Sequence, residues 1–264
     1  MIYKRELRKN VKSLLIWSVI LCGLILMSLS IYPQFTENKD MIDELLQAYP
    51  EPFKEAFGMN DLDFGSLLGF YGVEIHFMVA LLGSIYAVML ASNILSKEEN
   101  EKTIEFLLSK PITRSQILTE KLGAVLTHIL IFNLLIMIVS LIGFQFSSED
   151  YALSTFLFLI LGTVLMHLTF AALAFLLSSF MRKSRTITAV SLGLVLISYF
   201  LSIVSGMTEQ LEGLKYLSLF KYVDAADIIK ESALSPLYAF LMLVVIAASI
   251  GLTYSTYRKK DIAV

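Results

Sequence analysis

The chain of 264 residues is rich in apolar side chains, and this limits its class. Hydrophobic residues make up 56% of it and the mean hydropathy is +0.72, whereas soluble domains are about 45–50% apolar. A net charge of −2 gives no positive field suited to nucleic acid. The single cysteine, Cys22, excludes an intramolecular disulfide and a cysteine-rich metal site. We therefore expect an all-α, polytopic integral membrane protein.

The first 13 residues are basic and amphipathic. They carry one acid, Glu6, and five cations, which are Lys4, Arg5, Arg8, Lys9 and Lys12. Apolar residues recur every three or four positions, which is typical of a helix lying on an anionic membrane surface. We expect an elbow helix over residues 1–13. It acts either as a topology anchor, which the pattern favours, or also as a contact for a partner subunit.

Six uncharged apolar stretches follow, each long enough to cross a bilayer as a helix. We place the spans at residues 14–31, 75–96, 122–146, 153–181, 186–206 and 234–257. The first stretch lacks a small-residue cleavage site, so we expect a retained span rather than a signal peptide.

The distribution of Lys and Arg predicts the orientation of these spans. With the N-terminus inside, 16 of the 21 cations fall in inner segments and five in outer ones. Such a bias is typical of cytoplasmic loops. We expect both termini, including the tail at 258–264, to be cytoplasmic, in the inner membrane of a bacterium.

The longest charged inner segment, residues 97–121, is more structured than a simple loop. Read as a helix, it places Ile104, Leu107 and Leu108 on one apolar stripe. Phe106 points to the opposite side, where a large ring is exposed unless a partner covers it. This pattern favours a docking element, although an ordinary solvated loop with a frayed helix carries about equal weight.

A turn and a second helix follow within the same segment. Pro111 cannot continue the first helix. Thr113 and Gln116 have the spacing of a capping box, so a new helix should begin near Arg114 and run into the third span.

These residues resemble the cytoplasmic signature of the permease subunits of type-2 (ABC-2 class) ABC exporters. In that family an acidic run leads into Thr-Ile-Glu-x-Leu-Leu and then Ser-x-Pro-Ile-Thr-Arg. The matching residues here are Glu98, Glu99, Glu101, Thr103, Ile104, Glu105, Leu107, Leu108, Ser109, Pro111, Ile112, Thr113 and Arg114, followed by Lys121. Lys102 stands where relatives often have glycine, which favours an unbroken helix.

The resemblance implies that this segment is the coupling helix of a permease and sits on a separate ATPase. Its interface would comprise Glu98, Glu99, Glu101, Thr103, Ile104, Glu105, Phe106, Leu107, Leu108, Pro111, Thr113 and Arg114. The expected partners are two ABC ATPase subunits, which hold ATP and magnesium, a second permease as homodimer or heterodimer, and membrane lipid. The chain itself would bind no cofactor and catalyse no reaction.

Two outer connections are more than linkers. Residues 32–74 contain two helix-like pieces, 39–49 and 53–57, and are interpreted as a cap that either gates substrate or simply packs. Residues 207–231 are apolar for a loop and predict short outer helices, because backbone at membrane depth must satisfy its own hydrogen bonds. Small residues four apart, at Ala189/Gly193 and Ala247/Gly251, permit close helix packing.

Other chemistry has little support in the sequence. No P-loop pattern occurs, and the three histidines lack metal-ligand spacing, so we expect packed or interfacial roles for them. The span interiors carry no Asp, Glu, Lys or Arg, which disfavours an ion-coupled secondary transporter. The alternative that the chain is a non-transporting immunity or sensor subunit of an ATPase stays open. The apolar spans favour an amphiphilic, lipid-like or peptide substrate over a small ion.

Overall fold

The computed structural model is a bundle of long helices. It describes residues 2–37, 48–50, 54, 62–100, 112–181, 183–207 and 209–259, without the side chains of 35–37, 98–100, 207 and 209–212. Within these ranges no strand occurs, and six helices are long and apolar enough to cross a membrane. The predicted all-α, six-span architecture is therefore confirmed.

The helices have the following bounds. The first span is α1 (Ile2–Glu37). The second consists of α4 (Leu67–Phe70), the π-helical η1 (Tyr71–His76) and α5 (Phe77–Asn100) in succession, and the third is α7 (Arg114–Phe144). Next come α8 (Leu153–Phe180) and α9 (Ser184–Met207). The short helices η2 (Glu209–Leu217), η3 (Lys221–Val223) and α10 (Ala225–Glu231) precede α11 (Pro236–Lys259). The short helices predicted between the last two spans are thus present.

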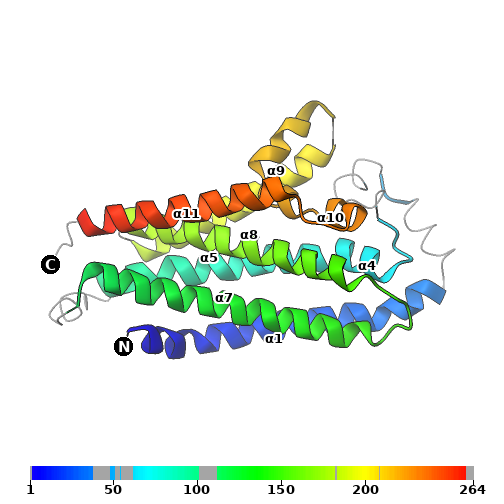
Figure 1. The fold of residues 1–264 in the computed structure, drawn as a ribbon, viewed down its shortest axis with the longest axis horizontal. Helices are drawn as coiled ribbons and strands as arrows, with labels where there is room; N and C mark the ends of the chain where they lie inside the picture. Colours follow the sequence, from blue (N-terminus) through cyan, green and yellow to red (C-terminus); the bar gives the residue numbers. More distant parts are fainter. Residues whose placement is uncertain are drawn as a thin grey trace.

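The long helices lie side by side, and α1 begins at the same end of the bundle where α11 finishes (Figure 1). We call this the basic end, because it carries the cations of early α1, Arg114 and Arg258; the opposite end is the distal end. Helix α5 contacts α1, α7, α8 and α9, whereas α11 packs mainly on α8. Helix α5, together with α8, on which α5 packs most extensively, is therefore central to the bundle.

The predicted elbow is not a separate element, because α1 is one helix of 36 residues. Its length is about 54 Å, against a hydrocarbon core of about 30 Å. The side chains of Lys4, Arg5, Arg8, Lys9 and Lys12 are all exposed. The basic turns can therefore project beyond the apolar layer without a bend. The helices predicted at 39–49 and 53–57 lie almost wholly outside the described residues.

Close helix packing occurs at glycines other than the predicted ones. A Cβ on Gly83 would lie 2.3 Å from the His167 ring, and one on Gly143 would lie 2.3 Å from Leu29. Only glycine fits these crossings of α5 with α8 and of α7 with α1. Around Gly193 and Gly251 no atom lies within 4 Å of such a Cβ. Among the residues that the structure describes, there is therefore no close helix packing at either of these two glycines.

Candidate functional site

Most of the predicted coupling interface lies outside the described residues. This holds for Glu101, Thr103, Ile104, Glu105, Phe106, Leu107, Leu108 and Pro111, and for the side chains of Glu98 and Glu99 in the last turn of α5. Thr113 and Arg114 are described. The predicted segment therefore connects the end of α5 to the start of α7 at the basic end.

The start of α7 has the capping geometry expected from the sequence. The Thr113 hydroxyl accepts a hydrogen bond from the Gln116 amide at 3.2 Å, and the Gln116 side-chain carbonyl accepts from the Thr113 amide at 2.9 Å. These two reciprocal bonds satisfy backbone donors that a helix leaves free at its start. Helix α7 therefore begins at a defined residue, Arg114, directly after the predicted coupling segment.

Arg114 ties the start of α7 to the end of α11. Its guanidinium donates to the backbone carbonyls of Tyr257 at 3.4 Å and Arg258 at 3.3 Å. Arg258 in turn donates from Nε to the Ser115 hydroxyl at 2.9 Å. A cation at the carbonyl end of a helix also interacts favourably with the helix dipole. Arg114 is therefore a link between helices and not solely a surface charge.

Two further links reach α5 and α1. Lys121 is 1% exposed, and its ammonium donates to the Ile94 carbonyl of α5. The Tyr3 amide donates to the Glu120 carboxylate at 2.9 Å, and the hydroxyls of Tyr3 and Thr127 lie 2.9 Å apart. The sequence placed Lys121 at a membrane entry but held no signal for its burial. The start of α7 is thus bonded to α1, α5 and α11.

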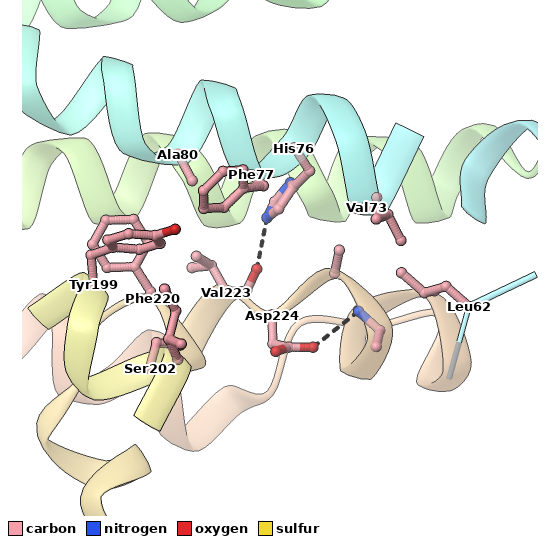
Figure 2. Close-up of a pocket in the computed structure, with 14 residues that line it drawn as sticks. Leu62, Val73, His76, Phe77, Ala80, Tyr199, Ser202, Phe220, Val223 and Asp224 are labelled. Atoms are coloured by element: carbon pink, nitrogen blue, oxygen red, sulfur yellow. Dashed lines mark hydrogen bonds between the residues drawn. The ribbon is translucent and has the colours of Figure 1, made fainter. Parts of the chain in front are cut away.

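A cavity of about 80 Å³ lies toward the distal end, between η1 and α5 on one side and α9, η3 and α10 on the other. Figure 2 shows that most labelled side chains around it are apolar. These are Leu62, Val73, Phe77, Ala80, Phe220 and Val223, with Tyr199 beside them. His76, Ser202 and Asp224 supply its polar groups. The cavity suits an apolar or aromatic group better than an ion.

Residues 218–231, which we call the cover segment, close this cavity. His76 donates from Nε2 to the Val223 carbonyl at 2.7 Å, a buried hydrogen bond between η1 and the cover segment (Figure 2). Val223 packs on Gly162 of α8, where an added Cβ would lie 3.2 Å from it. The Ser218 hydroxyl donates to the Ser198 carbonyl of α9 at 2.6 Å. Three helices therefore hold the cover segment.

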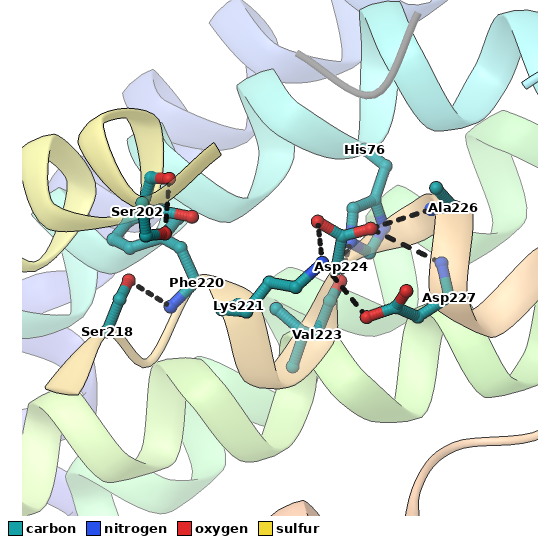
Figure 3. A network of polar contacts seen from close by, with 10 residues as sticks. His76, Ser202, Ser218, Phe220, Lys221, Val223, Asp224, Ala226 and Asp227 are labelled. Atoms are coloured by element: carbon teal, nitrogen blue, oxygen red, sulfur yellow. Dashed lines mark hydrogen bonds and ion pairs between the residues drawn. The ribbon is translucent and has the colours of Figure 1, made fainter. Parts of the chain in front are cut away.

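The cover segment also has an internal ionic network (Figure 3). The Lys221 ammonium lies 3.2 Å from an Asp224 oxygen and 3.0 Å from an Asp227 oxygen. The other Asp224 oxygen caps the first turn of α10. Burial lowers the pKa of Lys221, but the two carboxylates outweigh burial and raise it above its ordinary value. Lys221 therefore stays charged and braces the turn into α10.

The histidines are packed and hydrogen-bonded, as the sequence predicted. His167 lies 3.1 Å from the Asn133 side-chain oxygen and 3.2 Å from the Val79 carbonyl, which joins α8 to α7 and α5. His128 bonds to the Ala124 carbonyl of its own helix. Over the part of the chain that the structure describes, no group of three or more His, Cys, Asp or Glu is placed to hold a metal ion.

Comparison with known proteins bears on the whole chain. A family model described as "ABC-2 family transporter protein" matches residues 1–262. A search of curated proteins finds no match. The family match includes the basic end, the central helices and the distal cavity together.

Proposed function

We propose, from the premise that this chain belongs to the ABC-2 family of transporter membrane proteins, that it is the permease subunit of an ATP-driven exporter. Membership implies association with an ABC ATPase. In this proposal two ATPase subunits hold ATP and magnesium, and a second permease, identical or related, completes the assembly. The chain itself carries no catalytic residue.

The observation that carries the proposal is the course of α5. Its first turns line the distal cavity with Phe77 and Ala80, and its last turn leads directly into the predicted coupling segment. The helix has 24 residues, which corresponds to about 36 Å. One rigid element therefore connects a partner-facing segment with a cavity across most of the bilayer.

The links at the basic end indicate how motion would spread. When the ATPases close on ATP, they would displace residues 98–111. Because Lys121 bonds to Ile94 and Arg114 to the end of α11, α5, α7 and α11 would move together there. The His76 and Ser198 bonds to the cover segment are the contacts that this motion would alter at the distal end.

The cavity lining supports a substrate class in this proposal. Its aromatic and aliphatic walls favour an amphiphile, a lipid-like molecule or a peptide side chain over a small ion. The basic end faces the cytoplasm of a bacterial cell, because cations gather in cytoplasmic segments. The distal cavity then lies toward the outer face, beneath the cover segment.

The test is co-purification of an ATPase with the tagged chain from native membranes in mild detergent. Phe106→Arg should abolish ATPase recovery, because a charged side chain cannot fill an apolar groove. Phe146→Arg is the matched control; it changes an exposed phenylalanine just beyond the other end of α7 and should leave recovery unchanged.

Equal ATPase recovery with Phe106→Arg and Phe146→Arg would contradict docking through Phe106. An ATPase that co-purifies but shows no substrate-stimulated hydrolysis would indicate a non-transporting partner. Transport that collapses with an ion gradient and needs no nucleotide would indicate a secondary transporter.

A further inference from the structure

A second cavity, of about 420 Å³, opens at the basic end. It lies between early α1, the end of α5 and the start of α9, and both α1 and α9 pack on α5. Its polar lining consists of Asn10 and Ser13 from α1, Asn93 and Lys97 from α5, and Ser184 from α9. Neither the predicted coupling interface nor the distal cavity uses these side chains.

The walls of this cavity are preformed. The Ser184 hydroxyl donates to the Asn93 side-chain oxygen at 2.6 Å, which fixes the start of α9 against α5. The Asn10 amide donates to the Glu6 carbonyl one turn earlier at 2.9 Å. Asn10, Asn93 and Ser184 are therefore held in position by bonds within the protein, so a ligand would find these groups in place.

The charged residues beside the cavity are mainly cations, although Glu6 lies one turn before Asn10 and Glu98 and Glu99 follow Lys97 in the chain. Lys97 is in the lining, and the residues beside the α1 and α9 linings include Lys9, Lys12, Lys183 and Arg185, all exposed. Of the described residues that line the cavity, none is acidic. This surrounding favours an anion, and phosphate is the anion present at this level of a bilayer.

The helix faces beyond the cavity are apolar and exposed. On α1 these are Ile16, Val19 and Ile20, and on α9 they are Val190, Leu194 and Ile197. We propose that the cavity binds the headgroup phosphate of an anionic phospholipid, whose acyl chains lie along α1 and α9. The lipid would come from the leaflet at the basic end, which is the inner one if the proposed orientation holds.

Trp17 provides a probe at this site, because it is the single tryptophan of the chain. It lies one turn beyond Ser13 on the same face of α1 and is half-buried against Tyr86. The full-length chain is placed in nanodiscs with dibrominated phosphatidylglycerol or dibrominated phosphatidylcholine. We expect phosphatidylglycerol to quench Trp17 fluorescence at a mole fraction about fivefold lower, since one cation near the phosphate, here Lys97 of the lining, strengthens binding by about that factor.

Two variants connect this preference to the cavity. Lys97→Gln removes the charge of the lining, and Ser13→Leu fills the cavity. Both variants should bring the ratio of the two quenching mole fractions, phosphatidylcholine to phosphatidylglycerol, close to one. Lys259→Gln is the matched control, because it removes an exposed cation at the basic end on α11, away from the cavity. It should leave the preference intact.

Three results would overturn the proposal. Equal quenching by the two lipids, or a preference retained in both Lys97→Gln and Ser13→Leu, would show that the cavity does not select an anionic lipid. Absence of quenching by either lipid would indicate that a second protein chain covers the cavity. Because Phe106→Arg should leave quenching unchanged, failure of ATPase docking is distinguishable from failure of lipid binding.

Discussion

The two ends of the bundle are held together by different chemistry. At the basic end, charged and polar side chains bond the start of α7 to three other helices, with Lys121 fully buried. At the distal end, aromatic and aliphatic side chains surround a small cavity, and a buried histidine bond and two bonds with Ser198 attach the cover segment. The start of α7 is cross-linked to its neighbours by directional bonds, whereas the cover segment is attached mainly by packing.

This difference assigns a role to each end. Directional bonds to α1, α5 and α11 resist relative sliding of those helices, so the basic end should move as a unit when it is pushed. The cover segment has few hydrogen bonds to the spans and is held mainly by buried apolar side chains, among them Phe220, Val223 and Ile228, so its release exposes apolar surface and breaks few directional bonds. In the proposed function, the basic end would receive force from the ATPase and the distal end would open, and the two kinds of contact are consistent with that division.

The largest effect should come from a change between the two ends. Gly83→Ala places a methyl group where the His167 ring lies, and such overpacking costs about 3 kcal/mol. Because the added methyl group would push α5 and α8 apart, both ends of the bundle should lose stability together. The midpoint of thermal unfolding in detergent measures this loss of stability. Gly193→Ala is the control, since nothing lies within 4 Å of its Cβ; equal midpoints for the two variants would contradict the packing described.

Loss of the buried ammonium should weaken the basic end. Lys121→Met keeps the aliphatic stem but leaves the Ile94 carbonyl without its charged donor, at a cost of about 2 kcal/mol. The thermal midpoint should fall below that of Lys259→Met, in which an exposed lysine on α11 is changed the same way. If both variants melt alike, the Lys121 link does not stiffen this end.

Loss of the histidine bond should loosen the distal end alone. His76→Phe removes the donor to the Val223 carbonyl, worth about 1 kcal/mol, and should raise exposure of the cavity about fivefold. In a Cys22→Ala background, Ser202→Cys reports that exposure through labelling by a thiol reagent. Leu237→Cys, at a position that is 60% exposed, should label at an unchanged rate. Unchanged labelling at position 202 would show that His76 does not secure the cover segment.

The smallest effect should come from the cap of α7. Thr113→Ala removes the hydroxyl that accepts from the Gln116 amide and should cost roughly 0.5–1 kcal/mol. Hydrogen exchange at the first turn of α7 should accelerate, while Thr113→Ser keeps the cap and should exchange as the parent does. Acceleration spread over all of α7 would mean that the cap also maintains the links to α11.

Local patterns in the sequence were sufficient for much of the fold. Long uncharged runs specify spans wherever the solvent is lipid, and the Thr113–Gln116 spacing located the start of α7 correctly. The same patterns could not show that α1 runs without a break. A separate elbow helix and the first turns of a longer span give the same basic amphipathic pattern in the sequence.

Features that depend on distant neighbours were not predictable. Gly83 matters because the ring of His167, which is 84 residues away in the chain, lies against it in space. By contrast, no atom lies within 4 Å of a Cβ built on Gly193 of the Ala189/Gly193 pair. Lys121 is buried because α5 offers the Ile94 carbonyl. His76 meets the cover segment only through the tertiary fold. For the candidate site, the sequence predicted a coupling segment, most of which lies outside the described residues, and the structure added the distal cavity and the links of α7.

In the proposed function, the predicted coupling segment and the distal cavity are mechanically connected. The most direct test is the labelling rate of Ser202→Cys, in a Cys22→Ala background, in the reconstituted complex with and without ATP. The account predicts that ATP changes this rate, and that Phe106→Arg abolishes the change whereas Phe146→Arg preserves it. A labelling rate indifferent to ATP, in a complex that hydrolyses ATP, would contradict the connection.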